Sequence, residues 1–390
     1  MTFSQSFSTY FSSILTIVLT YLLTLFLYRS YCKYTTRRKK RNCKYATRRK
    51  KRKHRFVRGV RLTLSLLPVS LLAALRGIEV GADTLNVWSG YLECLKRPLA
   101  EQITIDVSEF FYDLFRWLVC RITNGNVQVF FFLLAFLTLL FVVFAINKWN
   151  IKYKCLALFI FLMLFGPNLM NQSRQMLSVA IMVYSFSCLY KGSYKQFVFW
   201  SIIAIFTHFS AIIAVTLYLF VYLACKKNRV NVAFLVFLIA LAVSSKYLIA
   251  FLGRFVVFEK YTKYFENTES FGIGLGLLLL LIPTIIPTVL AKKEIRDSRI
   301  RNTIYLTAPI RIIGYYSYFL YRITYYFSGI TMVALPVAVE QARGTKRAVL
   351  RISFIVLPLI YFLLFYCWKD VEVYMPYYAF WDNNLAQYLL

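Results

Sequence analysis

Apolar runs of about 20 residues recur from one end of this chain to the other. Each run is long enough to cross a hydrocarbon core about 30 Å thick as a helix. The composition agrees, since 59% of the 390 residues are hydrophobic and only 16% are charged, whereas a soluble domain is about 45–50% apolar and about 25% charged. The sequence therefore predicts an all-α polytopic membrane protein, with residues 1–390 forming a single integral membrane domain.

The formal net charge of +31 is concentrated in one segment, residues 29–61, which holds 17 Lys and Arg and no acid. It contains a short tandem repeat, CKYTTRRKKR at 32–41 and CKYATRRKKR at 43–52. We interpret it as a basic cytoplasmic loop that lies on anionic lipid headgroups. Nucleic-acid binding is disfavoured, because the tandem repeat has no aromatic platform among its charges beyond Tyr34 and Tyr45.

Placing this loop inside gives a topology with the N-terminus outside and about 12 transmembrane helices, some of them short or paired as hairpins. The inner connections then collect 33 basic residues and three acids, and the outer segments hold the other 13 acids. A wrong number of spans would place basic and acidic residues on both sides of the membrane. The expected spans are 10–28, 62–75, 127–147, 155–170, 174–190, 196–207, 209–225, 230–250, 271–290, 302–319, 323–338 and 348–368.

The apolar stretch 197–225 would be about 43 Å long as a single helix, too long for one untilted span. Both of its ends are basic, and Thr207, His208 and Ser210 interrupt its middle. A hairpin that turns at His208 keeps both basic ends inside, and we therefore expect two short helices there.

The longest outer segment, 76–126, is expected to carry amphipathic interfacial helices. Asp106 and Glu109 have the spacing of a capping box that opens a helix, which would run to about Ile122. Glu109 then has two interpretations, a capping residue or a functional carboxylate. Asp83 likewise is either a turn residue or part of a site.

Four arginines lie at outer span ends: Arg76, Arg174, Arg254 and Arg322. Arg174 begins a span, where a cation opposes the helix dipole. Burying it in lipid would cost about 2.5–3.5 kcal/mol. The arginines either reach out to headgroups or bind an anion, and the guanidinium fork suits phosphate. Several of them converging on one cavity would form a pyrophosphate clamp.

Other chemistry is sparsely represented. His208 is either a packed core histidine or a general base at the outer face, because its ordinary pKa is near neutral. The sequence has no metal-ligand cluster, no Gly-rich phosphate loop and no Gly-x-Ser-x-Gly motif. The eight cysteines are scattered, and Cys94 and Cys120 could pair in an oxidising compartment, although their spacing does not require it.

Several short motifs occur in order on the predicted outer face: Arg76-x-x-x-Val80-Gly-x-Asp83-Thr84, Glu109-x-x-Tyr112, Asn171-x-x-Arg174-Gln175, Thr207-His208-Phe-Ser210, Arg322-x-x-x-Tyr326-Phe327 and Met375-Pro376-Tyr377. The ordered set, from about residue 65 to 380, resembles the EpsG-type exopolysaccharide polymerases, a branch of the Wzy-type polymerases. The basic tandem repeat lies outside this pattern.

The resemblance implies a GT-C-like, metal-independent glycosyltransferase without a cofactor, in the bacterial inner membrane. The topology derived from charge puts both termini on the periplasmic side. The substrate would be an oligosaccharide on undecaprenyl pyrophosphate. The growing glycan would move to the non-reducing end of a new lipid-linked unit, at the outer face. A chain-length regulator protein is a candidate partner. The sugar, the linkage, the stereochemical outcome and the kind of polysaccharide stay open.

The resemblance also suggests roles for individual residues. Pyrophosphate would be bound by Arg174 and Arg322, and then by Arg76 and Arg254. The proton of the acceptor hydroxyl would pass to His208, Asp83 or Glu109. For the aromatic residues, the competing interpretation is the interfacial aromatic belt. The candidate glycan-binding residues are Trp88, Tyr112, Asn171, Gln175, Tyr326 and Tyr377.

Two other functions are weighed against the polymerase. An O-antigen ligase would carry its largest outer loop late in the chain, whereas here that loop is early. A lipid-linked oligosaccharide flippase would show internal repeats and broken helices at mid-membrane. The two halves of this chain show no such repeat, and we therefore favour the polymerase.

Overall fold

The computed structural model describes residues 3–41, 48–101, 109–225, 285–291, 293–314, 318–369 and 371–381. Within these ranges the regular structure is helical, apart from one isolated bridge between Arg76 and Ala379. Five helices of the described part are long and apolar enough to span a membrane, and three shorter ones are also apolar. The all-α, multi-pass character is therefore confirmed for the described residues.

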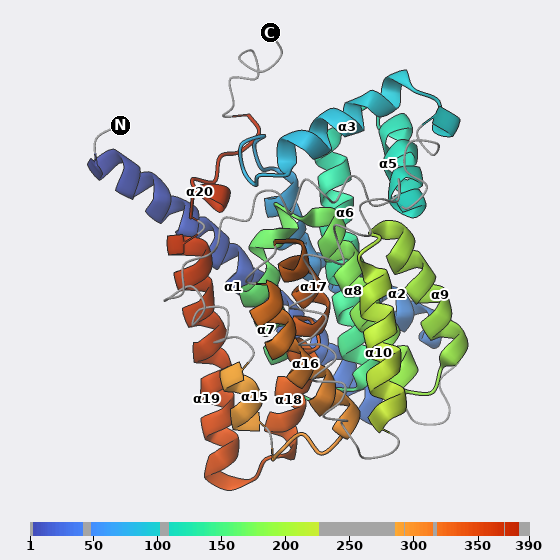
Figure 1. Cartoon of the computed structure of the whole chain (residues 1–390), viewed down its shortest axis with the longest axis vertical. Helices are drawn as coiled ribbons and strands as arrows, with labels where there is room; N and C mark the ends of the chain where they lie inside the picture. The colour runs from blue at the N-terminus through green and yellow to red at the C-terminus, as the bar shows by residue number, and fades with distance from the viewer. Residues whose placement is uncertain are drawn as a thin grey trace.

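The helices form an elongated bundle (Figure 1). Their bounds are α1 Phe3–Arg41, α2 Arg48–Ala74, α3 Thr84–Lys96, α5 Phe110–Ile122, α6 Val127–Trp149, α7 Lys154–Phe165, η2 Pro167–Leu169, α8 Ser173–Tyr190, α9 Tyr194–Thr207, α10 Ala211–Cys225, α15 Ile285–Ala291, α16 Ser298–Gly314, α17 Tyr318–Ser328, α18 Thr331–Gln341, α19 Gly344–Tyr361, η4 Phe362–Lys369 and α20 Val371–Tyr374.

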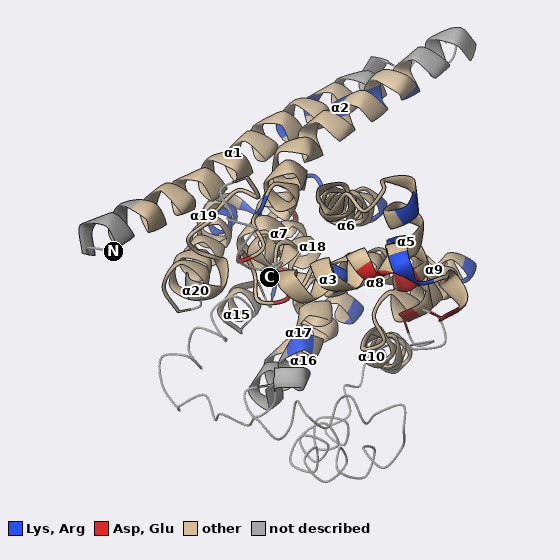
Figure 2. Cartoon of the chain, turned by 90° about the horizontal axis from the view of Figure 1, so that it is seen from above, with Lys and Arg blue, Asp and Glu red and all other residues tan. Residues whose placement is uncertain are grey.

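Helices α1 and α2 form a long pair that lies side by side along one edge of the bundle (Figure 2). The basic segment expected as a loop is helical on both sides, up to Arg41 and again from Arg48. Aromatic contacts tie its two arms together. Tyr34 lies 5.2 Å from the ring of His54, and the Arg61 guanidinium lies 4.4 Å above Tyr34.

Helix α8 runs through the core, between α6 and α9. Small serines on its surface let the α9 backbone come close, as is common in membrane helix pairs. The Ser178 hydroxyl donates to Ala204 O at 2.8 Å, and the Ser185 hydroxyl donates to Phe197 O at 2.9 Å. These bonds fix α9 against α8 along its length.

The predicted hairpin at His208 is confirmed. Helix α9 ends at Thr207, His208 takes an extended backbone conformation, and α10 begins at Ala211. The turn is closed by a backbone hydrogen bond of 3.0 Å from Ala211 N to His208 O. Each arm is too short to be an ordinary span of about 20 residues.

The span predicted at 323–338 falls within one apolar helical segment that is long enough to cross a membrane, Arg322–Gln341. A turn at Gly329 and Ile330 divides that segment between α17 and α18. The spans predicted at 230–250 and over most of 271–290 fall outside the described residues. The total of 12 spans and the GT-C-like fold remain predictions.

Helix α3 crosses one end of the bundle, where both views place it over the ends of the long helices (Figures 1 and 2). The turn that leads into it is fastened by the segment 373–380. Gly77 N donates to Tyr378 O at 2.7 Å, Gly81 N donates to Val373 O at 2.9 Å, and Phe380 N donates to Leu75 O at 2.8 Å. Two remote parts of the chain thus build this end together.

Gly81 is required at this turn. Its φ of +92° is in the left-handed region, and a Cβ would lie 2.5 Å from Met170 O. Gly192 also has a positive φ, +73°, but open space surrounds it. Comparing substitutions at the two glycines therefore separates the free-energy cost of a positive φ from the cost of the contact with Met170 O.

We predict that Gly81→Ala destabilises the protein more than Gly192→Ala. The second substitution carries only the conformational cost, about 1–2 kcal/mol. The first adds a steric clash with the backbone that joins η2 to α8. Unfolding temperatures of the two purified variants in detergent are the measurement. Equal losses would show that the contact with Met170 is unimportant.

Candidate active site

The turn between α7 and α8, residues 166–173, is held from below by a buried asparagine. Asn168 is 1% exposed. Its Nδ2 donates to the Tyr366 hydroxyl at 3.0 Å, and its Oδ1 accepts from the Tyr374 hydroxyl at 2.5 Å. A buried amide with both ends satisfied fixes its surroundings strongly. The turn that leads into α8 at Ser173 therefore has a defined conformation.

The same turn holds the loop that precedes α3. Asp83 N donates to Asn171 Oδ1 at 3.0 Å, and the Thr84 hydroxyl donates to Met170 O at 3.1 Å. These bonds place the Asp83 carboxylate beside α17. Its Oδ2 lies 3.7 Å from a guanidinium nitrogen of Arg322.

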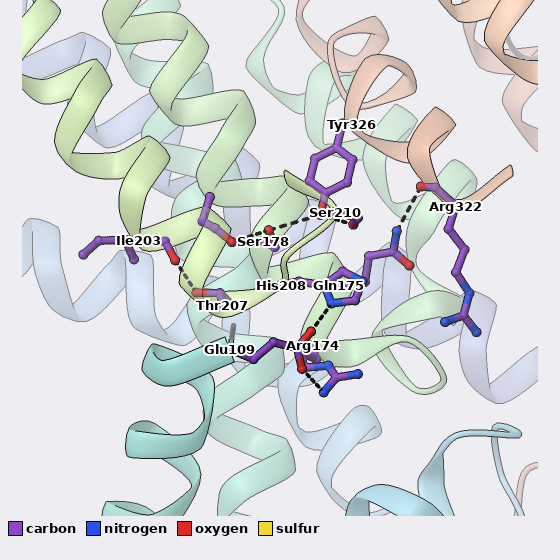
Figure 3. A network of polar contacts seen from close by, with 11 residues as sticks. Glu109, Arg174, Gln175, Ser178, Ile203, Thr207, His208, Ser210, Arg322 and Tyr326 are labelled. Carbon is purple, nitrogen blue, oxygen red and sulfur yellow. Dashed lines mark hydrogen bonds and ion pairs between the residues drawn. The ribbon is translucent and has the colours of Figure 1, made fainter. Parts of the chain in front are cut away.

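Glu109 connects α5, α8 and the α9–α10 turn (Figure 3). One carboxylate oxygen accepts a hydrogen bond from Arg174 at the start of α8, and the other lies 2.7 Å from His208 Nδ1. Glu109 is only 4% exposed, whereas the Arg174 side chain is 41% exposed. The buried carboxylate thus offsets the cation that opposes the α8 dipole.

Arg322 reaches the same place from α17. Its backbone carbonyl accepts from Gln175 Nε2 at 2.9 Å, which ties α17 to the first turn of α8. One helical turn after Arg322 on α17, the Tyr326 hydroxyl lies 3.0 Å from Ser210 Oγ and 3.2 Å from Ser178 Oγ. These bonds secure the turn that carries His208.

The converging side chains enclose a cavity of about 270 Å³. They come from the loop before α3 and from α3, α5, the α7–α8 turn, α8, the α9–α10 turn and α17. The lining residues are Asp83, Asn86, Val87, Tyr112, Arg116, Asn171, Gln172, Ser173, Arg174, Gln175, His208 and Arg322.

The polar atoms of this lining that have no hydrogen-bond partner within the described part of the chain include the Ser173 hydroxyl and Gln175 Oε1. Both residues are 3% exposed. A buried polar group without a partner costs about 1–3 kcal/mol. Both groups lie in the first turn of α8, which has no side-chain cap. The helix end therefore offers unused hydrogen-bonding groups and a partial positive charge to a ligand.

The protonation of His208 follows from its surroundings. Burial lowers the pKa of the imidazole below its usual value, while the hydrogen bond to Glu109 and the charge of that carboxylate oppose the shift. The ring is therefore neutral near pH 7. Since an ionised carboxylate only accepts, Nδ1 carries the proton and Nε2 keeps its lone pair.

The structure brings together seven of the thirteen residues expected from the sequence and places Glu109 directly behind them. The seven that line the cavity are Asp83, Tyr112, Asn171, Arg174, Gln175, His208 and Arg322. Glu109 does not cap α5, since its side chain makes no capping hydrogen bond. The predicted capping box pairs Glu109 with Asp106, which lies outside the described residues, so that interpretation stays a prediction.

Arg76 is not brought to the cavity. Its guanidinium is 1% exposed, donates to Ala73 O and, at 3.2 Å, to the Thr84 hydroxyl, and lies 3.7 Å above the ring of Phe131. Burial lowers the pKa of Arg76 to about 9, which leaves it cationic at neutral pH. The side chain stabilises the loop before α3.

Three of the expected glycan-binding aromatic residues also lie outside the cavity lining. Trp88 packs edge-on against Phe131, and Tyr326 is fully buried in the network below His208. The Tyr377 hydroxyl donates to Leu72 O at 2.6 Å. Arg254 is outside the described residues.

Sequence reasoning missed Arg116 and Asn86, both of which line the cavity. Arg116 pairs with Asp113 at 2.9 Å within α5, and it lies about two helical turns beyond Glu109. That spacing could have placed Arg116 and Glu109 on one face. Asn86 follows Asp83 at a helical spacing of three residues, another signal that periodicity could have used.

Among the described residues, no three His, Cys, Asp or Glu side chains lie together as metal ligands. Cys94 and Cys120 are both buried, and they form no disulfide with each other. The Cys120 thiol donates to Tyr91 O on α3, at 3.2 Å. The polar groups available to a ligand in the cavity are thus arginine, amide, hydroxyl, carboxylate and imidazole.

The ordered motifs now have a shared location, and comparison with known families agrees with them. The family model described as the EpsG family matches residues 60–379. The chain belongs to the EpsG family. No curated protein and no solved structure is similar enough to be matched. EpsG membership gives polysaccharide repeat-unit polymerisation, a glycosyltransferase-like activity, as the general function of this multi-pass protein.

We predict that Glu109→Ala lowers the free energy of unfolding by about 1–3 kcal/mol, because Arg174 and His208 both lose a partner. Unfolding in detergent, followed by circular dichroism, measures the loss. Glu93→Ala is the matched control, since Glu93 is exposed on α3 and exposed substitutions usually stay within about 0.5 kcal/mol. Comparable losses in the two variants would contradict a buried bridging role for Glu109.

Proposed function

We propose that the cavity binds the pyrophosphate of a polyprenyl-linked oligosaccharide and transfers the growing glycan to a new lipid-linked repeat unit. The observation that carries this proposal is the convergence of Arg174, Arg322 and the uncapped start of α8 on one cavity, with His208 on its wall. One part of the cavity suits an anion and another suits an acceptor hydroxyl. Undecaprenyl pyrophosphate is the carrier we expect from the family.

The anion-binding part acts on the leaving group. When the bond between the anomeric carbon and the pyrophosphate oxygen breaks, negative charge grows on that oxygen. Donors that are already in place stabilise such a charge without reorganising. Arg174 uses one terminal nitrogen on Glu109, and the guanidinium has further N–H groups for phosphate oxygens. Arg322 forms an ion pair with Asp83 at 3.7 Å and lines the same cavity.

The other part handles the proton. The acceptor sugar hydroxyl gives its proton to His208 Nε2 as its oxygen bonds to the anomeric carbon, and the lipid pyrophosphate leaves with the electron pair. Glu109 holds the ring through Nδ1 at 2.7 Å and stabilises the imidazolium that forms. His208 is then the general base, Glu109 a positioning residue, and Asp83 a partner of Arg322.

The remaining assignments follow from this cavity. Tyr112, Asn171 and Gln175 face the same space and are the proposed sugar contacts. We place this end of the bundle at the periplasmic face of the inner membrane, since the helices α1 and α2 carry the basic segment 29–61 and basic connections favour the cytoplasm. Both termini are then periplasmic, and a chain-length regulator would bind on this side.

We predict that Arg174→Ala reduces polymerisation at least about 100-fold, which is the usual order of loss when one preorganised donor to a developing charge is removed. The measurement is the polymer ladder formed from purified lipid-linked repeat units. Arg121→Ala is the control, because Arg121 is an exposed arginine on α5 outside the cavity lining.

Full-length ladders from inserted Arg174→Ala protein would overturn the proposal. The same assay addresses the alternatives. Movement of lipid-linked units across liposomes, without any increase in glycan length, would show a flippase. Transfer of glycan to a different acceptor lipid, also without lengthening, would show a ligase.

The histidine mechanism predicts an acidic limb in the pH–rate profile. Activity requires neutral His208, so the rate falls as pH falls through its pKa, which burial places below the usual value. Glu109 raises that pKa. In Glu109→Gln the raising contribution is lost, and the limb should move to lower pH. Single-turnover rates over a pH series measure the shift, and a limb that moves upward would contradict the pairing.

A further inference from the structure

A second cavity, of about 520 Å³, lies between α1, α7 and α19. Helix α7 packs against both of the others, and the three are neighbours in Figure 1. The cavity adjoins the start of α7, whereas the candidate active site lies beyond the other end of that helix. The two sites share no lining residue. We call it the α1–α7–α19 slot.

Each of the three helices contributes a cation to the slot, namely Arg29, Lys154 and Arg351. Lys152, just before α7, adds a fourth. The lining residues, all in the described part of the chain, include no carboxylate. Glu340 pairs with Lys152 at 3.3 Å. In the described residues neither arginine has a carboxylate within ion-pair distance, so the slot keeps an excess of positive charge.

The rest of the lining is mostly apolar, and its large hydrophobic side chains take regular positions on the helices. Leu25 lies one turn before Arg29 on α1, and Ile355 lies one turn after Arg351 on α19. Since α1 runs opposite to α19, both steps lead in the same direction along the bundle. Phe159 on α7 takes the corresponding place. The slot thus has a cationic level and, about 5.4 Å further along, an apolar level.

This apolar level is open at the side. Phe26, which also lines the slot, is 71% exposed, and Ile355 is 39% exposed. On a helix that crosses a membrane, such side chains face acyl chains. A molecule that enters from the bilayer can therefore place an anionic group among the cations while its hydrocarbon part stays beside these residues.

We propose that the α1–α7–α19 slot is a binding site for an anionic phospholipid, with the phosphate held by Arg29 and Arg351 and an acyl chain on the apolar level. A free phosphate ion would use only the cationic half. A zwitterionic phospholipid carries its own cation into a slot that already has an excess of them. The bound lipid joins α1 and α19 across α7, the helix that leads to the turn of the candidate active site.

The test measures binding of fluorescent phosphatidylglycerol to the purified full-length protein in detergent. Arg29→Gln/Arg351→Gln should weaken binding about tenfold or more, since each arginine donates charge-assisted bonds to phosphate. Lys191→Gln/Lys195→Gln is the matched control. It removes the same charge from exposed positions, just after α8 and in the first turn of α9, and should change binding less than about twofold. If the double arginine variant does not fold, each single variant is measured.

Competition identifies the ligand. Unlabelled phosphatidylglycerol should displace the probe, while phosphatidylcholine with the same acyl chains and inorganic phosphate should not. Displacement by inorganic phosphate at similar concentrations would show a simple anion site and overturn the proposal. Equal weakening in the arginine and lysine variants would also overturn it, because binding would then follow total charge. Polymerase activity is not the readout, so failure here leaves the proposed function untouched.

Discussion

The candidate active site depends on one buried carboxylate that holds two basic groups from different helices. Glu109 precedes α5, Arg174 begins α8, and His208 lies in the α9–α10 turn. A buried carboxylate is tolerated when it is paired and hydrogen-bonded, and both oxygens of Glu109 are used. The same contacts let a cation lie at the positive end of α8 and keep the imidazole in one tautomer. Glu109 therefore stabilises this end of the bundle and also holds Arg174 and His208 in position for catalysis.

The other polar contacts around the cavity act through backbone that is fixed elsewhere. Asn168 is held by Tyr366 and Tyr374 and fixes the conformation of the turn before α8. Asn171, in the same turn, accepts a hydrogen bond from Asp83 N. Little of the cavity's shape then depends on the ligand. A preorganised cavity of this kind suits electrostatic stabilisation of a leaving group, because its dipoles need not reorient during the reaction.

Much of this could be predicted from the sequence, and the failures have physical reasons. The hairpin at His208 followed from two basic ends and a polar middle, and Arg174 followed from its conflict with the helix dipole. Glu109 had two interpretations because a capping residue and a bridging carboxylate look the same locally, and its partners are 65 and 99 residues away in sequence.

Other errors come from burial that no local pattern reveals. Arg76 looked like Arg174 as a cation at a span end, yet its guanidinium is buried away from the cavity, where it donates to Ala73 O and the Thr84 hydroxyl. Tyr326 fell in the right motif but lies below the cavity, where it supports Ser210. Arg116 went unnoticed because its pair with Asp113 resembles any surface pair on a helix.

The fastening of the loop before α3 by residues 373–380 has a consequence for biosynthesis. Residues that line the cavity are spread from Asp83 to Arg322, and the turn beside them is completed by hydrogen bonds to Val373, Tyr378 and Phe380. A ribosome must therefore release nearly all of this chain into the membrane before the cavity has its final walls. The turn beside the cavity is therefore completed only after residues 373–380 have been synthesised and have docked on the loop before α3.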